Sequence, residues 1–350
     1  MDEQNLDDYL DYSDYYSSEH IQGFGLCEQT HLREFGRTFQ PTVYSTVAIL
    51  GILANSMLIF IFIKHADIRK IPALCMAISD LLFAATLPFY AVYANISQWI
   101  FGQSACKILT FLYIVTLYSS NFSLAFMALD KYYSVVSGFC CLRIKRISVK
   151  NMAAFFVLIF SLVASIPHVY FIETLEYDGH QLCSYHHVPA WRTFMKFEDN
   201  IAGFVVPFVI MSVCSALMTS NMIKTCPNKW CSVLKQEMAF VVTFFVLWLP
   251  YNVIMFMLAL QELHIILDCF THQNLHLAVQ LTECLAFTHA FVNPLLYSMQ
   301  NRRIRKLFKT ALRGTPELLL ESSENPTAVE LTEVQTYNGT HPKSEFLSVN

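Results

Sequence analysis

The chain has 350 residues, of which 55% are hydrophobic and only 14% are charged, with a formal net charge of −4. Soluble domains carry roughly a quarter charged residues, so this composition excludes an ordinary soluble globular protein. The slightly acidic balance also gives no reason to expect binding to nucleic acid.

Seven apolar stretches recur along the sequence, and each is long enough to cross the hydrocarbon core of a bilayer, which takes about 20 helical residues. Only short polar segments separate them, which leaves no room for a separate soluble domain. The chain is therefore predicted to be an all-α membrane protein, a seven-transmembrane helix bundle over residues 40–299. The predicted spans are 40–64, 71–94, 105–137, 152–172, 197–224, 236–261 and 275–299.

Basic residues are distributed unequally among the segments between the spans. They gather after span one, between spans three and four, between spans five and six, and from Arg302 onward. Because cytoplasmic segments carry the excess of Lys and Arg, the N-terminus is predicted to be extracellular and the protein multi-pass in the plasma membrane. The first 26 residues show no signal-peptide pattern, so the first span is expected to act as the insertion signal.

Residues 1–39 form the predicted extracellular tail, whose first part is rich in acid and tyrosine. Its candidate contact residues are Asp11, Tyr12, Asp14 and Tyr15. Such a segment buries too little apolar area to fold alone. It is either simply a solvated tail, or it attracts a basic protein partner, with tyrosines flanked by acid as substrates for sulfation.

The opposite end of the chain combines a basic helix with a polar tail. Residues 300–313 place Arg and Lys against Ile304, Leu307 and Phe308 at helical spacing, which predicts a short amphipathic helix on the anionic membrane lipid of the inner leaflet. Residues 314–350 are acidic and rich in Ser and Thr, and they are expected to be disordered and phosphorylated in the cytoplasm.

Ionisable residues inside a membrane are costly and therefore mark function. The sequence places Asp80, Asp130, Lys131, Glu283 and His289 in or at the edge of spans. No phosphate-binding loop, His-Glu-x-x-His helix or nucleophile elbow is present, so neither an enzyme nor a catalytic residue is predicted. A transporter is disfavoured because no matching pair of broken spans is seen.

Short motifs stand in a fixed order along the spans: ANSMLI, AISDLLFAATLPF, LDKYYSVV, FFVLWLPYN and NPLLY. This order resembles the rhodopsin-like (class A) G-protein-coupled receptors. Within that class, the Thr86-Leu87-Pro88 step, QWIFG, WLPYN and TECLAFTHAFVNPLLY resemble chemokine receptors of the C-C type. The resemblance covers nearly all of residues 27–312.

Four of the eleven cysteines, Cys27, Cys106, Cys183 and Cys269, fall in the outer segments, where oxidation is possible. The resemblance implies that Cys106 pairs with Cys183, and that Cys27 pairs with Cys269 to hold the tail near the third outer loop. The alternative for any of them is a free buried thiol. The other seven are expected to be free.

The resemblance also implies a ligand site in the outer half of the bundle. It makes Glu283 an anchor for the N-terminal segment or amine of a chemokine; the alternative is a carboxylate satisfied by internal hydrogen bonds. The aromatic residues Trp99, Tyr113, Trp248 and Tyr251 are its expected neighbours, although such residues are also ordinary packing.

A polar core is expected around Asp80. Together with Asn55, Ser120 and Asn293 it resembles the site that holds a structural sodium ion in inactive receptors of this class, and oxygen ligands suit such a hard cation. The alternative is a protonated Asp80 that is hydrogen-bonded to the two Asn side chains. No other metal and no cofactor are expected.

The inner face departs from the family pattern, because Lys131 stands where most relatives have Arg. Lysine keeps the charge but lacks the planar fork of donors, so contacts to a G protein and to span six are not automatically kept. Ser215 replaces the usual Tyr of span five. The residues expected in coupling and activation are Asp130, Lys131, Tyr132, Pro250, Asn293, Pro294 and Tyr297.

These features predict a cell-surface receptor for C-C chemokines that couples to a heterotrimeric G protein of the inhibitory class, and so to calcium mobilisation and chemotaxis. Its expected partners are a basic chemokine, the G protein and arrestin. The alternative is an atypical receptor that scavenges chemokine without G-protein signalling. In either case the ligand acts by shifting the balance between conformations of the bundle.

Overall fold

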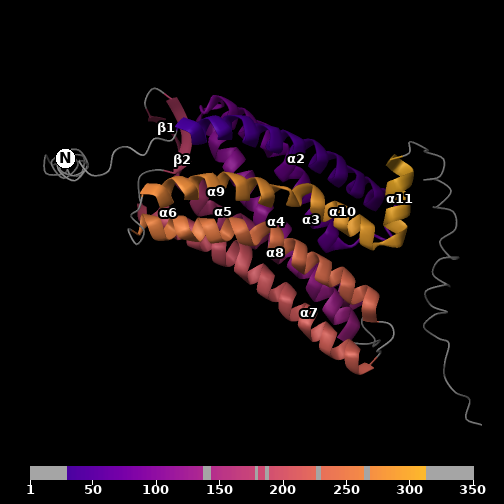
Figure 1. Ribbon diagram of the computed structural model, residues 1–350. Helices are drawn as coiled ribbons and strands as arrows, with labels where there is room; N and C mark the ends of the chain where they lie inside the picture. The colour runs from indigo at the N-terminus through magenta and orange to yellow at the C-terminus, as the bar shows by residue number, and fades with distance from the viewer. Residues whose placement is uncertain are drawn as a thin grey trace, which may run out of the picture.

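The computed structural model describes residues 30–136, 143–177, 180–185, 189–225, 230–263 and 269–312, which form a helical bundle with a small hairpin at one end (Figure 1). Its elements are α2 (Thr30–Lys64), α3 (Ile71–Ile96), α4 (Gly102–Val136), α5 (Arg143–Phe171), β1 (Ile172–Tyr177), β2 (His180–Tyr185), α6 (Pro189–Glu198), the π-helix η1 (Asp199–Val205), α7 (Val206–Thr225), α8 (Trp230–Glu262), α9 (Cys269–Phe287), α10 (His289–Gln300) and α11 (Arg302–Leu312).

Within the described residues, six helical segments are long and apolar enough to cross a membrane. They are α2, α3, α4, α5, the continuous segment of α6, η1 and α7, and α8. The seventh crossing is made of α9 and α10, which are interrupted at Thr288, whose hydroxyl donates to the carbonyl of Leu285 at 2.6 Å. The predicted seven-helix membrane bundle is therefore confirmed.

Large apolar side chains cover the outside of the bundle as well as its interior. Ile49, Leu53 and Ile63 on α2 and Phe156 and Ile166 on α5 are all exposed. Exposed apolar residues on this scale are expected where lipid surrounds the helices, while the backbone polar groups stay paired inside each helix. The surface itself thus indicates a membrane protein.

The helix α2 begins upstream of the predicted span at residue 40. Its first turns contact other helices: Arg37 Nε donates to the carbonyl of Asn95 on α3 at 3.0 Å. Gly36 lies so close to the side chain of Gln280 on α9 that an added Cβ would sit 3.0 Å from Oε1. Tertiary contacts, rather than an apolar run, therefore extend this helix.

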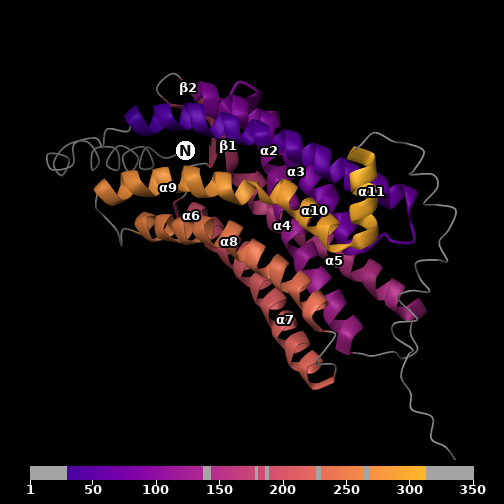
Figure 2. The ribbon, with the colours of Figure 1, turned by 45° about the vertical axis from the view of Figure 1, so that its right-hand side comes forward.

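The hairpin and α11 lie at opposite ends of the bundle in both views (Figures 1 and 2). In the antiparallel hairpin, Thr174 pairs with Cys183. Cys183 is bridged to Cys106 at the start of α4, with their Cα atoms 5.8 Å apart, which confirms the first predicted disulfide. Cys27 lies outside the described residues, so the second predicted bridge is not described.

At the other end, α11 crosses the bundle beside α10 and α2 (Figure 2). Asn301 begins it as an N-cap, because its Oδ1 accepts hydrogen bonds from the backbone N–H groups of Arg303 and Ile304. The apolar face of Ile304, Leu307 and Phe308 is buried in the bundle core. The predicted amphipathic helix is present, and its apolar face packs on the core of the bundle.

Candidate functional site

A cavity of about 260 Å³ reaches from the hairpin to the middle of the bundle. Its walls come from α3, α4, α5, β2, α6, η1, α8 and α9, so it is the place where most of the helices meet. The residues that line it are Tyr90, Tyr113, Ile114, Leu117, Asn121, His168, Tyr185, Arg192, Met195, Lys196, Asp199, Gly203, Trp248, Tyr251, Asn252, Met255 and Glu283.

The half-buried carboxylate of Glu283 lies on one wall of this cavity. Its Oε2 accepts a hydrogen bond of 2.8 Å from the hydroxyl of Tyr44 on α2, and that hydroxyl accepts one of 3.2 Å from Gln40. Among the residues that the structure describes, no Lys, Arg or His forms an ion pair with Glu283. The carboxylate is thus held in place by a neutral donor and keeps its capacity to accept from a cation.

Three of the four aromatic residues predicted around Glu283 line the cavity with it: Tyr113, Trp248 and Tyr251. The fourth, Trp99, does not line it. Its ring lies 5.3 Å from that of Tyr93, and its Nε1 donates to the carbonyl of Gly102 at 2.9 Å.

Trp99 is almost fully buried in a cluster with Cys106 and Ile172. The indole therefore packs where β1 and α4 begin, and its hydrogen bond to Gly102, the first residue of α4, holds it there. The predicted tail residues Asp11, Tyr12, Asp14 and Tyr15 lie outside the described residues.

The cations of the cavity are already paired. Arg192 Nε and Lys196 Nζ contact the same carboxylate oxygen of Glu262 on α8, at 2.6 and 2.5 Å. Thr193 donates to the other oxygen of Glu262 at 2.9 Å. This network joins α6 to α8 near the outer end and leaves Glu283 and Asp199 as acidic groups of the lining without either cation.

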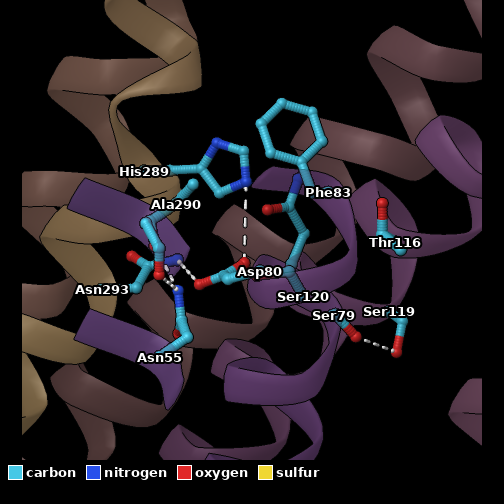
Figure 3. A network of polar contacts seen from close by, with 12 residues as sticks. Asn55, Ser79, Asp80, Phe83, Thr116, Ser119, Ser120, His289, Ala290 and Asn293 are labelled. Atoms are coloured by element: carbon cyan, nitrogen blue, oxygen red, sulfur yellow. Dashed lines mark hydrogen bonds and ion pairs between the residues drawn. The ribbon is translucent and has the colours of Figure 1, made fainter. Parts of the chain in front are cut away.

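The predicted polar core surrounds Asp80, which is fully buried between α3, α4 and α10 (Figure 3). Ser120 Oγ donates to its Oδ1 at 2.5 Å, and Asn293 Nδ2 donates to its Oδ2 at 3.1 Å. Asn55 does not hydrogen-bond to Asp80. Its amide donates instead to the carbonyls of Gly51 and Ala290, at 2.9 and 2.6 Å.

The residues around Asp80 fit a sodium ion poorly. A hard cation prefers a shell of oxygen ligands, and both oxygens of Asp80 already accept hydrogen bonds. His289 presents its Nε2 at 3.7 Å from Oδ1 (Figure 3), so a nitrogen and not an oxygen faces this side of the carboxylate. The buried Oδ1 of Asn55 has no hydrogen-bond partner among the described residues.

The inner end of the bundle holds an ion pair that the sequence analysis missed. Lys131 Nζ on α4 lies 2.7 Å from Oε1 of Glu237 on α8, and 5.4 Å from the centre of the Phe240 ring. The exposed fraction of the side chain is 21% for Lys131 and 2% for Glu237. The contact joins helices that belong to spans three and six.

A second contact ties α8 to α10 at the same end. Gln236 Nε2 donates to the carbonyl of Gln300 at 3.1 Å, and Gln300 Nε2 donates to that of Gln236 at 3.0 Å. Beside them the ring of Tyr297 is buried and lies 5.9 Å from that of Phe62. Three helices of the inner end are therefore held together by polar contacts.

The other residues expected in activation are two prolines inside helices and the two neighbours of Lys131 in the chain. Pro250 lies inside α8, and the buried Pro294 lies inside α10. Tyr132 packs against the inner core and contacts the ring of Tyr133, at 5.5 Å between centres. Asp130 is half-buried next to Lys131.

Comparisons with known proteins agree with this architecture. The family described as "7 transmembrane receptor (rhodopsin family)" matches residues 54–297. The chain is 34% identical to human C-C chemokine receptor type 4 over 313 residues, which are 85% of each chain. It is 30% identical to mouse atypical chemokine receptor 2, over 87% of this chain and 85% of the relative. It is also 29% identical to human C-C chemokine receptor type 1, over 81% and 82%.

G-protein-coupled receptors of the chemokine type are not enzymes, as predicted from the missing enzyme motifs. The apolar helices fit a multi-pass protein of the plasma membrane. With the family match over most of the bundle, and with relatives matched over about 85% of their own length, the protein belongs to the rhodopsin family of seven-transmembrane receptors and, within it, to the chemokine receptors.

Proposed function

We propose that the protein is a cell-surface receptor for C-C chemokines that couples to a heterotrimeric G protein of the inhibitory class, and thereby drives calcium mobilisation and chemotaxis. The observation that carries this proposal is Glu283, a carboxylate held by Tyr44 at the wall of a cavity whose two cations are paired with Glu262. A cationic group of a ligand finds there an oriented acceptor whose charge is not compensated by either of these two cations.

In this proposal the tail of residues 1–39 is extracellular and captures the basic core of the chemokine. Clustered acid accelerates the encounter with a basic partner, and sulfation of tyrosines would add to the charge. The chemokine N-terminus then enters the cavity and pairs with Glu283. The bridge from Cys106 to Cys183 fixes the hairpin beside the cavity, and a bridge from Cys27 to Cys269 would fix the tail.

A continuous set of contacts leads from the cavity toward the inner end. Trp248 of the cavity lies 5.0 Å from His289, measured between ring centres, and His289 lies beside Asp80 (Figure 3). The break at Thr288 and the prolines Pro250 and Pro294 remove helix hydrogen bonds nearby, which lets α8 and α10 bend. A ligand that binds better to the bent bundle shifts the population toward it.

Coupling then requires the inner end to open. The ion pair of Lys131 with Glu237 holds α4 to α8, so its release is the step that would admit the G protein. Arrestin is expected to bind the phosphorylated Ser and Thr residues of 314–350 after activation.

The experiment that tests this function is a screen of C-C chemokines on cells that express the native chain or Lys131→Arg. One chemokine is expected to lower cyclic AMP through the native chain, and Lys131→Arg to raise the maximal response about threefold, because a guanidinium offers more donors to a G protein than an ammonium does. The matched control is Lys235→Arg, an exposed position on α8.

The alternative function is a scavenger, and two observations favour it. Lys131 stands where most of the family has Arg, and one relative with 30% identity is named an atypical chemokine receptor. If the native chain and Lys131→Arg both bind and internalise chemokine while cyclic AMP and calcium stay unchanged, the protein does not signal through a G protein and is a scavenger.

The polar core gives a further prediction. Because His289 faces Asp80 with nitrogen, we expect chemokine affinity to change by less than about twofold when sodium is replaced by N-methylglucamine at constant ionic strength. The measurement is competition binding on membranes, with Asp80→Asn as comparison. If chemokine affinity depends on sodium in the native chain but not in Asp80→Asn, a sodium ion does bind at Asp80 and this prediction is wrong.

A further inference from the structure

Five polar side chains meet where α4, α5, β2 and the junction of α6 with η1 come together on the cavity wall. His168 Nε2 lies 3.1 Å from Oε2 of Glu198 and 3.6 Å from Oδ1 of Asp199. The hydroxyl of Tyr118 lies 2.9 Å from Glu198 Oε1 and 3.0 Å from Asp199 Oδ1, which share its single proton, and Tyr185 Oη lies 2.9 Å from His168 Nδ1. We call this group the His168 cluster.

The His168 cluster carries more acid than base. Glu198 and Asp199 face a single imidazole, and the two other cations of the described cavity lining, Arg192 and Lys196, contact Glu262 instead. Two carboxylates held this close in a membrane protein are costly unless a cation compensates them. A divalent cation bound with a neutral imidazole would balance their charge.

The distances match those of a metal site. One ligand atom from each of His168, Glu198 and Asp199 lies within 4.8 Å of the other two. Zinc binds His nitrogen and carboxylate oxygen at about 2.0 to 2.2 Å, so tetrahedral ligands stand about 3.3 to 3.6 Å apart. The measured separations from Nε2, 3.1 and 3.6 Å, bracket that range. No other group of three such residues is found within the described residues.

The surroundings also resemble the support that metal ligands receive. A zinc-bound histidine usually donates its other ring N–H to an oxygen, which fixes the ring, and Tyr185 Oη occupies that place. Neighbouring residues of an α-helix point about 100° apart, yet Glu198 and Asp199 both contact the hydroxyl of Tyr118. The junction to a π-helix begins at Asp199, and π-turns are frequent at functional sites.

We propose that the His168 cluster is a zinc site with three protein ligands, His168 Nε2, Glu198 Oε2 and Asp199 Oδ1. His168 and Asp199 line the cavity, so the fourth position opens toward it and takes water or a group of the ligand. The ion ties α5 to the junction of α6 with η1 and stiffens this wall of the cavity. The inference does not depend on which ligand the cavity takes or on coupling to a G protein.

The test uses the full-length chain purified into lipid nanodiscs without chemokine. Bound zinc is measured by equilibrium dialysis against about 0.1 to 100 µM zinc chloride, and thermal unfolding is followed in parallel. One zinc per chain is expected, together with a rise of about 5 °C in the unfolding temperature at saturation. Asp199→Asn and His168→Gln should each weaken zinc binding at least about tenfold, and Tyr185→Phe about tenfold through the imidazole.

The matched controls are His180→Gln and Glu173→Gln on the hairpin, which should bind zinc like the native chain. The isosteric Asp199→Asn keeps the test valid if His168→Gln does not fold. Equal zinc binding by the native chain, Asp199→Asn and His168→Gln would overturn the proposal, as would no binding by the native chain. If zinc does not bind but Asp199→Asn weakens chemokine binding as Glu283→Gln does, the cluster is instead a subsite for a cationic group of the ligand.

Discussion

Replacing Glu283 by Gln is expected to weaken chemokine binding about 10- to 100-fold. A hydrogen bond to a charged group contributes about 1.5 to 3 kcal/mol, and each 1.4 kcal/mol is a factor of ten in affinity. Glutamine keeps the size of the side chain and its contact with Tyr44, so the change removes the charge and little else. The measurement is competition binding of a labelled chemokine on membranes, corrected for the amount of receptor at the cell surface.

Two comparison variants identify the cause of this effect. Tyr44→Phe removes the donor but keeps the carboxylate, and its affinity should stay within about threefold of the native value. Asp11→Asn with Asp14→Asn should slow association in a salt-dependent way, whereas Glu283→Gln should speed dissociation, because the tail steers the encounter and the cavity holds the ligand. If Glu283→Gln and the tail variant both bind chemokine with native affinity, the proposed binding pose is wrong.

The spans could be predicted from the sequence because lipid imposes a simple requirement on composition and length. All seven apolar stretches met this requirement in the sequence; among the described residues six of them are unbroken helical segments, and the seventh is divided into α9 and α10 at Thr288. The start of α2 at Thr30 could not be predicted, because the turns before residue 40 owe their helical state to contacts such as Arg37 with Asn95 and Gly36 with Gln280.

The candidate site was predictable only as far as the family resemblance reaches. It placed Glu283, Tyr113, Trp248 and Tyr251 around one cavity, but it also included Trp99, which packs beneath the hairpin. It did not find Tyr44, because the contact between Tyr44 and Glu283 spans the whole bundle in sequence. Such pairs depend on how each helix is rotated about its axis, which apolar composition leaves undetermined in a membrane.

Glu237 shows a related limit. It is the second residue of the predicted span six, 236–261, where an acid at the edge of a span can either reach water or be buried, and the local sequence does not decide between the two. The structure buries it against Lys131, which is itself the unusual residue of the Asp130-Lys131-Tyr132 motif. Lys131, which departs from the family pattern, and Glu237 on α8 thus form one ion pair.

Glu237→Gln is expected to raise basal nucleotide exchange on an inhibitory G protein at least about tenfold without chemokine. Breaking a buried ion pair costs about 3 to 5 kcal/mol, and a bias of 1.4 kcal/mol between closed and open bundles already changes their ratio tenfold. Lys131 is partly exposed and can turn to water, whereas Glu237 is buried, so Lys131→Met leaves an uncompensated carboxylate and should destabilise the bundle more. Exchange is measured with purified receptor and G protein in vesicles.

The charge-reversed pair of Lys131→Glu with Glu237→Lys decides whether the ion pair itself is responsible. Because the reversal restores attraction between α4 and α8, basal opening should return toward the native level, while each single reversal should open the inner end. Spin labels at the exposed residues Tyr133 and Met238 report this opening even if the receptor does not signal. Lys235→Gln, which changes a neighbouring exposed charge, should leave the distance unchanged. If Glu237→Gln leaves both the distance and the exchange rate at native values, the contact between Lys131 and Glu237 does not keep the inner end closed, and the reason for the lysine in this motif must lie with its partner in the cytoplasm.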